Sequence, residues 1–221
     1  MAKKGEGLFL VYTDLMDPKH EEEFNAWYNT EHLPELLTLP GFLDAARYVA
    51  TRGGPKYLAV YELSGTEALQ SPEFSKRKRT PWENRMSPRV TGKNRTRIVG
   101  RQIFPSTLEN SERGMAPALQ IGRMSVPESA DAEWNEWYNI EYIPGYLKVP
   151  GVIYARRYHA MDGARNFATV YELVNDKVSE SNDWSYQREH SSPRSGSMRE
   201  LMTMAPGSPG VYRRIFPQSN G

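Results

Sequence analysis

The chain has 221 residues, of which 38% are hydrophobic and 25% charged, an ordinary balance for a soluble protein of one large domain or two modules of about 100 residues. A formal net charge of +1 gives no electrostatic footprint for nucleic acid or an anionic membrane surface, and no run of about 18 apolar residues predicts a membrane span. Cysteine is absent, which excludes disulfides, thiolate nucleophiles and cysteine-based metal sites. We expect a cytoplasmic protein without a signal peptide.

The first half of the chain alternates β-rich segments with helix-compatible ones. A helix is expected from Asp17-Pro18, where Asp can cap and Pro fits the first turn, to about Leu37, before Pro40-Gly41. Gly53-Gly54 predicts a hairpin turn. Strands are expected at residues 8–14, 42–50, 56–63 and 97–104, and a polar helix-compatible stretch at 66–88.

The second half repeats this order after a polar segment. From Trp27 to Leu63 the sequence matches Trp137 to Leu173 without a gap, with 17 identities in 37 positions. Such a match indicates a tandem duplication. The second-half strands are expected at residues 118–124, 152–159, 166–173 and 211–216, with a helix at 130–147.

Each half therefore predicts a βαββαβ, ferredoxin-like unit of the α+β class. The first is expected at residues 1–106 and the second at 116–221, joined by a linker at 107–115. One such sheet has a bare face that a partner sheet must cover. We expect the two antiparallel sheets to pack within one chain as a pseudo-dimeric barrel that encloses a small-molecule cavity.

The helix of the first half carries an aromatic face with one titratable ring. Phe24, Tyr28 and His32 follow i, i+4, i+8 spacing, with Trp27 beside them. The corresponding face of the second half has Tyr142 in place of the histidine. Most of these rings are expected to be core. His32 alone has an unperturbed pKa near neutrality, so it is the candidate acid or base.

Charged and amide residues that occur in both halves are expected to support the scaffold. Glu31 and Glu141 lie within the aromatic faces, and Arg47 and Arg157 are the duplicated cations. We expect each glutamate to pair with the arginine of its own half, because an unpaired buried carboxylate is costly. Asn29 and its counterpart are expected to bond backbone near the helix end.

Residues that differ between the halves are the better guide to function. His159 stands where the first half has Val49, and Trp82 is a candidate for a cavity mouth. The four histidines have no metal-binding spacing, and no nucleotide-binding motif is present, so no cofactor and no metal are expected. The basic cluster at 76–79 is interpreted as a solvated helix face.

The pattern Trp27-Tyr-x-x-Glu-His-x-Pro34, followed by Pro40-Gly41-Phe42 and Arg47-Tyr48, resembles the EthD-like family of the dimeric α+β barrel superfamily. The resemblance covers both halves, although the motif is complete only in the first. Relatives in this superfamily include cofactor-free isomerases, decarboxylases, dehydratases, quinone-forming monooxygenases and haem-binding enzymes. In the isomerase-like members the histidine at the position of His32 is thought to transfer protons.

The leading hypothesis is a cofactor-independent lyase or isomerase for a small cyclic or aromatic catabolite. His32 would be the general acid or base, and Tyr28 and Tyr48 would orient the substrate or stabilise an enolate-like oxygen. The alternatives are an oxidative enzyme of the same superfamily, either a cofactor-free monooxygenase or a haem binder, and a non-catalytic binding protein. The expected state is a monomer or homodimer. Substrate contacts are expected from Trp27, Arg47, Phe24, Tyr142, His159 and Trp82.

Overall fold

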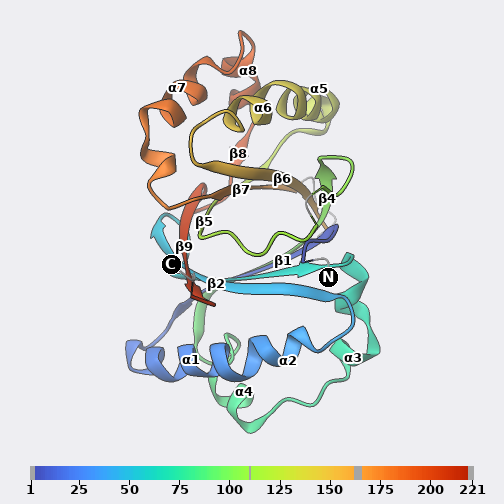
Figure 1. Cartoon of the computed structure of the whole chain (residues 1–221), viewed down its shortest axis with the longest axis vertical. Helices are drawn as coiled ribbons and strands as arrows, with labels where there is room; N and C mark the ends of the chain where they lie inside the picture. Colours follow the sequence, from blue (N-terminus) through green and yellow to red (C-terminus); the bar gives the residue numbers. More distant parts are fainter. Residues whose placement is uncertain (1–2, 110, 162–165, 219–221) are drawn as a thin grey trace.

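The computed structural model describes residues 3–109, 111–161 and 166–218. Figure 1 shows the strands in a central layer, with α1–α4 below it and α5–α8 above it. No helix among the described residues is long and apolar enough to cross a membrane.

The N-terminal half follows the predicted order with longer strands than expected. A single helical rod between β1 and β2 is built from a 3-10 turn, α1, a π-helical turn and α2. The elements are β1 (Gly7–Leu15), α1 (Glu21–Trp27), the π turn (Tyr28–His32), α2 (Leu33–Leu37), β2 (Phe42–Arg52), β3 (Tyr57–Leu63), α3 (Pro72–Ser75), α4 (Pro81–Met86) and β4 (Gly92–Phe104).

The C-terminal half repeats the order and adds one short strand. Its rod again contains a π turn, at Tyr138–Tyr142. The elements are β5 (Ala118–Ser125), α5 (Asp131–Trp137), α6 (Ile143–Tyr146), β6 (Val152–Ala160), β7 (Asn166–Leu173), α7 (Asn182–His190), α8 (Ser195–Glu200), β8 (Thr203–Met204) and β9 (Gly210–Phe216).

The two four-stranded sheets join at both edges into a closed antiparallel barrel of eight strands. The order is β7-β6-β4-β1-β3-β2-β9-β5, and β5 pairs back with β7. The joints between the halves are β4–β6 and β2–β9. Closure leaves neither sheet with a long open edge. The strand pairing that two separate copies would otherwise provide for each other is therefore made within one chain. This confirms the predicted fold class.

Three apolar clusters hold the layers together. One fills the barrel between the two sheets, because its members, among them Leu10, Tyr48, Val60, Ile121 and Val170, come from strands of both halves. The other two pack the helices of each half against the outer face of its own sheet. The expectation of a ligand cavity inside the barrel is therefore wrong: side chains occupy that space, as in other small closed barrels.

A buried ion cluster lies between the two sheets. The Nζ of Lys4 donates to Glu62 at 3.2 Å and to Glu172 at 2.7 Å, and Arg156 forms a double hydrogen bond with Glu62. All four side chains are at most 4% exposed. Each buried charge has an opposite charge as partner, which is the condition for tolerating it there. The cluster ties the first residues of the chain to both halves.

Candidate functional site

A cavity of about 370 Å³ lies in the N-terminal half, between the helical segments and the outer face of the sheet. Its size is in the range of small-molecule sites. One wall consists of aromatic rings, from Phe9, Trp27, Tyr28, Tyr61 and Phe74. The other side carries five guanidinium groups, from Arg77, Arg79, Arg89, Arg95 and Arg97. A flat, apolar and electron-rich or anionic ligand would match this combination.

The π turn presents Tyr28 and His32 to this cavity, and Trp27, the last residue of α1, lies directly before it. Pro34 has no amide hydrogen to donate to the carbonyl four residues earlier, which explains why the rod widens just before it. The His32 ring stacks on Trp27 with centroids 4.5 Å apart and meets Tyr28 edge-on at 5.2 Å. π turns recur at functional sites, and this one fixes the orientation of the imidazole.

His32 is held neutral by its surroundings. Burial lowers its pKa from 6.5 to about 3, and the positive charges of Arg77 and Arg47 act in the same direction. Its Nδ1 is inaccessible and has no hydrogen-bond partner within the described part of the chain. A ligand in the cavity would therefore have to give a proton to the other ring nitrogen of His32, Nε2, and the resulting cation would need to be stabilised.

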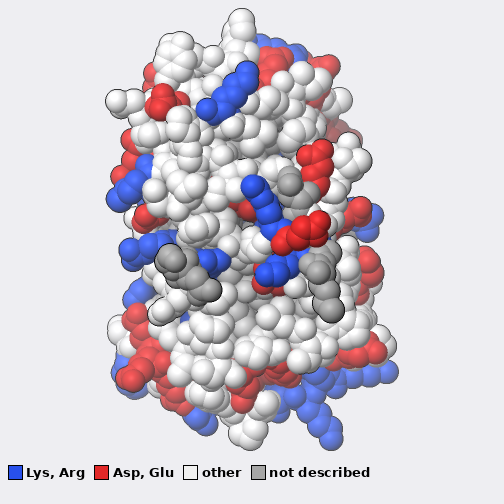
Figure 2. All heavy atoms as spheres, in the orientation of Figure 1, with Lys and Arg blue, Asp and Glu red and all other residues white. Residues whose placement is uncertain are grey.

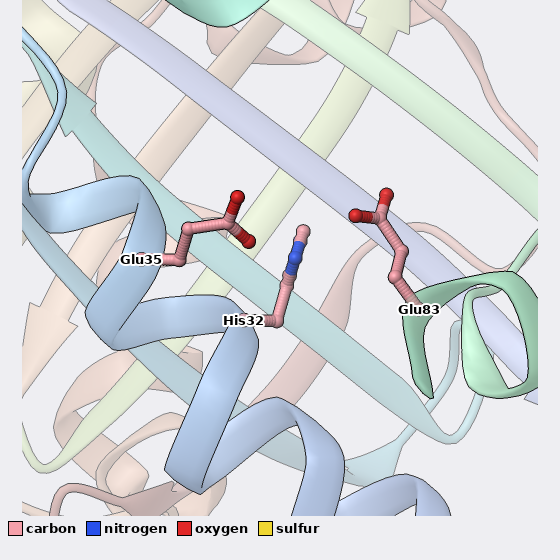
Figure 3. Close-up of side chains that lie close together, drawn as sticks. All are labelled: His32, Glu35 and Glu83. Carbon is pink, nitrogen blue, oxygen red and sulfur yellow. The ribbon is translucent and has the colours of Figure 1, made fainter. Parts of the chain in front are cut away.

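Two carboxylates lie beside His32, and both are paired with Arg77. Figure 3 shows Glu35 and Glu83 pointing toward the imidazole from opposite sides, Glu35 from α2 and Glu83 from α4. One ligand-type atom of each of the three residues lies within 4.8 Å of the others. Arg77 donates to Glu35 at 3.1 Å and to Glu83 at 2.6 and 2.7 Å. A guanidinium between the carboxylates opposes a metal cation there, and its positive charge also helps to keep His32 neutral.

Arg77 is firmly charged. Burial acts to lower its pKa, but the hydrogen bonds and charges of Glu83 and Glu35 outweigh burial and raise it. Lys and Arg side chains gather at the lower right of Figure 2, over the segment that joins α3 and α4 in Figure 1. The basic cluster at 76–79 is therefore not the solvated helix face that we expected: it lies between helices, and Arg77 and Arg79 line the cavity.

Three of the expected site residues line the cavity, and two lie behind it. His32, Tyr28 and Trp27 form part of its wall. Burial raises the pKa of Tyr28 to about 12, against the charge of Arg47, so its hydroxyl stays protonated. Phe24 and Arg47 are fully buried one layer further in, where the Arg47 guanidinium lies 4.5 Å from the Tyr28 ring centroid. They support the ring rather than face a ligand.

Tyr48, expected to act on the substrate, is on the wrong side of the sheet. It lies in the barrel interior, where its hydroxyl donates to the Ala116 carbonyl at 3.0 Å. Adjacent residues of a strand point to opposite faces, so Arg47 and Tyr48 cannot both face one ligand. This corrects the assignment.

The remaining candidates are also away from the cavity. His159, on β6, packs against Phe167 with ring centroids 5.3 Å apart. Trp82 donates its indole hydrogen to Glu23 at 3.1 Å and thereby ties α4 to α1. Tyr142 is buried in the C-terminal half, with its hydroxyl 3.2 Å from that of Tyr146. None of the three lines the cavity described above.

The glutamates of the aromatic faces do not pair with the expected arginines. Glu31 accepts from the Trp27 indole at 3.0 Å and from the Thr80 hydroxyl at 2.5 Å. Glu141 pairs with Arg194, at 2.6 Å. In both halves the carboxylate lies on the solvent side of the rod, where it ties the rod to the segment that follows the hairpin.

Arg47 and Arg157 contact amides and aromatic rings instead of the glutamates. Arg47 donates to Asn29 at 3.1 Å, and Arg157 donates to Asn139 at 2.6 Å. Each also lies over the tyrosine of its own π turn, with the Arg157 guanidinium 4.3 Å from the Tyr138 ring centroid. The asparagines therefore bond a side chain rather than backbone. Cation–π contacts and one amide replace the carboxylate that we expected.

The space equivalent to the cavity is filled with rings in the C-terminal half. At the offset of 110 residues, Leu36 corresponds to Tyr146 and His32 to Tyr142. The Tyr146 ring lies 4.9 Å from Tyr142, 5.3 Å from Tyr171 and 4.5 Å from Trp184, measured between centroids. The tyrosine and tryptophan take up the volume that is open beside Leu36.

Sequence reasoning missed Glu35, Glu83 and the arginines of the cavity. Glu35 and Arg77 lie 42 positions apart, and only the folded chain brings them together. One signal was available: the arginines at 95 and 97 have no counterparts in the second half, where the aligned residues are Gly207 and Pro209. Comparison of the halves, applied to cations as well as to histidines, would have pointed to them.

No family model matches the chain, and no curated protein matches it. Solved structures do. An anthrone oxidase-like protein matches with a TM-score of 0.65 at 11% identity, over 97% of this chain and 94% of that one. A protein from Fusobacterium nucleatum proposed to be a monooxygenase matches with a TM-score of 0.61 at 9% identity, over 96% of this chain and 93% of that one. Chlorite dismutase from Candidatus Nitrospira defluvii gives 0.59 at 14%, over 95% and 91%.

These names concern oxidative chemistry, and they overturn the leading hypothesis of a lyase or isomerase in favour of the oxidative alternative. At such low identity the likeness itself establishes the fold alone. The eight-stranded barrel with helices on both outer faces is a pseudo-dimeric α+β barrel, contained here in a single chain.

Proposed function

We propose that the protein is a cofactor-independent oxygenase whose substrate is an aromatic compound with an acidic C–H or O–H group. The observation that carries the proposal is the cavity of the N-terminal half, in which a neutral His32 lies among aromatic rings and a group of arginines. The names of the structural neighbours agree with this reaction class.

The reaction begins with proton transfer. The substrate lies against Trp27 and Tyr28, and His32 accepts its acidic proton. The imidazolium that forms lies beside the Glu35 and Glu83 carboxylates, and the guanidinium groups stabilise the substrate anion. The pKa of free His32 is low, so the proton moves only when a ligand anion forms beside these groups.

Dioxygen then reacts with the anion. For a methylene between two aromatic rings, the carbanion gives electrons to O₂ and forms a carbon–oxygen bond, which yields a hydroperoxide after protonation. Loss of water leaves a carbonyl. The methylene carbon is oxidised by four electrons, one oxygen atom enters the product, and the other leaves as water. Electron-rich substrates of this kind supply all the electrons, so no further reductant enters the balance.

A haem at His32 fits the residues poorly. A haem iron bound to the imidazole would carry its macrocycle into the space where Glu35, Glu83 and Arg77 approach the ring. These charged groups hydrogen bond one another and match a small, flat organic anion better than a porphyrin face. We derive no step through haem.

An oxygen-electrode experiment tests the proposal. The purified protein is given anthrone, the substrate type suggested by one neighbour's name, and oxygen uptake is compared with anthraquinone formation by absorbance. The proposal expects uptake and product in equal amounts, one ¹⁸O atom in the product under ¹⁸O₂, and unchanged rates with a chelator present. Product formed without oxygen, or tight binding without turnover of any acidic aromatic, would contradict it; the second result would indicate a binding protein.

We further infer that the two halves descend from one duplicated EthD-like unit, at residues 1–106 and 116–221. The 17 identities in 37 aligned positions and the common element order support this. In this view the C-terminal half has become a support whose ligand space is filled by side chains.

A further inference from the structure

Three arginines at the cavity have no carboxylate partner among the residues that the structure describes. Arg77 and Arg79 are paired with Glu35 and Glu83, at 3.1 and 3.6 Å. For Arg89, Arg95 and Arg97, no salt bridge or hydrogen bond to a carboxylate is found in the described portion of the chain. Three like charges around one opening repel each other, and a protein tolerates such a group where a ligand anion relieves the repulsion.

The strand geometry aims two of these groups at the cavity. Arg97 lies opposite Val11 in the β1–β4 register, and Val11 belongs to the cluster between helices and sheet. Arg95, two residues earlier, would point to the same face. The Arg97 guanidinium lies 4.9 Å from the Phe9 ring centroid, on the aromatic wall itself. A ring that stacks on that wall would place its substituent at these arginines.

The electrostatics of Arg97 favour a nearby anion. Partial burial lowers the pKa of this guanidinium, and the charges of Arg89 and Arg95 lower it further. Binding of an anion would reverse the effect of the two neighbours. Exposure of Arg95 and Arg97 to solvent leaves them accessible to a ligand that enters from outside.

We propose that Arg89, Arg95 and Arg97 form a subsite for an anionic oxygen group, most suitably a carboxylate, carried by an aromatic ligand whose ring lies on the Phe9–Trp27 wall. This rests on the proposed function for the identity of the cavity as the substrate site, and it adds the substrate class: an aromatic acid rather than a neutral polycycle. Planar guanidinium groups match the two oxygens of a carboxylate in geometry and charge.

Binding of three matched probes tests the subsite without reference to turnover. We would titrate the protein with 2-naphthoate, the neutral 2-naphthamide and 2-naphthyl phosphate, by calorimetry at low salt. The expected result is naphthoate binding about tenfold or more tighter than the amide, with the preference weakened by salt. Phosphate binding tighter than naphthoate would keep the anion subsite and assign it to a phosphate ester. Equal affinity for all three would overturn the proposal.

Variants locate the effect. Arg97→Gln and, separately, Arg95→Gln should each reduce the ratio of acid to amide affinity by about fivefold or more, because each removes a charge-assisted hydrogen bond. Arg101→Gln is the matched control, an exposed arginine on the same strand outside the cavity, and it should keep the ratio. Arg97→Gln should remain folded, because it removes the repulsion between Arg97 and the charges of Arg89 and Arg95. A melting curve checks this.

The result is separable from the proposed function. An unchanged acid-to-amide ratio in both variants, together with oxygen uptake on neutral anthrone, would sink the subsite and leave the oxygenase standing. Selective binding of the acid that depends on Arg97, without oxygen uptake on any acidic aromatic, would do the reverse.

Discussion

The two halves of the molecule share the order of their main strands, the π turn and the arginine over the tyrosine of that turn. In the described part of the chain a cavity lies beside the N-terminal π turn, whereas aromatic rings occupy the corresponding place in the C-terminal half. Leu36 leaves space beside His32, whereas Tyr146 and Trp184 fill it beside Tyr142. The shared residues build the scaffold, and the differing ones determine whether space is left beside the π turn. The second half can therefore serve as a control for the first.

The largest effect is expected at His32. His32→Gln should reduce turnover of an acidic aromatic by about 10² to 10⁴-fold, the usual contribution of a positioned base, because glutamine cannot take up the proton. Initial rates of oxygen uptake measure this. Tyr142→Phe, at the same position of the other half, should leave the rate within about twofold. Equal losses in the two variants would mean that the halves do not divide the work as described.

Stability should respond in the filled half. Tyr146→Ala removes a buried ring from a cluster of four aromatic side chains, and it should lower the free energy of unfolding by about 3–5 kcal/mol. Urea denaturation followed by tryptophan fluorescence gives the value. Leu37→Ala, an exposed position on the other rod, should cost less than about 1 kcal/mol. A small loss for Tyr146→Ala would show that this half tolerates a cavity too.

The pH dependence of stability should carry a signature of His32. Its pKa is about 3 in the folded protein and 6.5 as an ordinary value, so the unfolded chain binds the proton more readily. The stabilisation is complete above 6.5 and is lost as the pH falls toward 3. Between pH 7 and pH 5 the loss is at most about 2 kcal/mol. Between pH 7 and pH 5, His32→Gln should therefore lose up to about 2 kcal/mol less of its free energy of unfolding than the wild-type protein loses. Denaturation at several pH values measures this difference.

The smallest effect is expected from a substitution that gives the N-terminal half the ring found at the same position of the C-terminal half. Leu36→Tyr introduces the ring that the C-terminal half has at this position, and it should weaken binding of 2-naphthoate by about tenfold while leaving the fold intact, since the cavity accepts added volume. Calorimetry and circular dichroism measure the two parts. Unchanged affinity would place the ligand elsewhere.

The sequence predicted the fold and the rod of the site because both depend on local periodicity and on the internal match. Trp27, Tyr28 and His32 were found on one helix face for that reason. Tyr48 was misplaced although the alternation of a strand separates it from Arg47. The Glu35–Arg77–Glu83 cluster could not be predicted, since it joins two helices and the segment between α3 and α4, whose path no local pattern specifies.

The most direct measurement of the central claim is a crystal structure of the protein with an aromatic acid such as 2-naphthoate. The account predicts one ligand in the N-terminal half, its ring on the Trp27 side of the cavity near His32 and its carboxylate at Arg97. Density for the ligand inside the barrel, or beside Tyr142 in the C-terminal half, would contradict the division of the molecule into one working half and one supporting half.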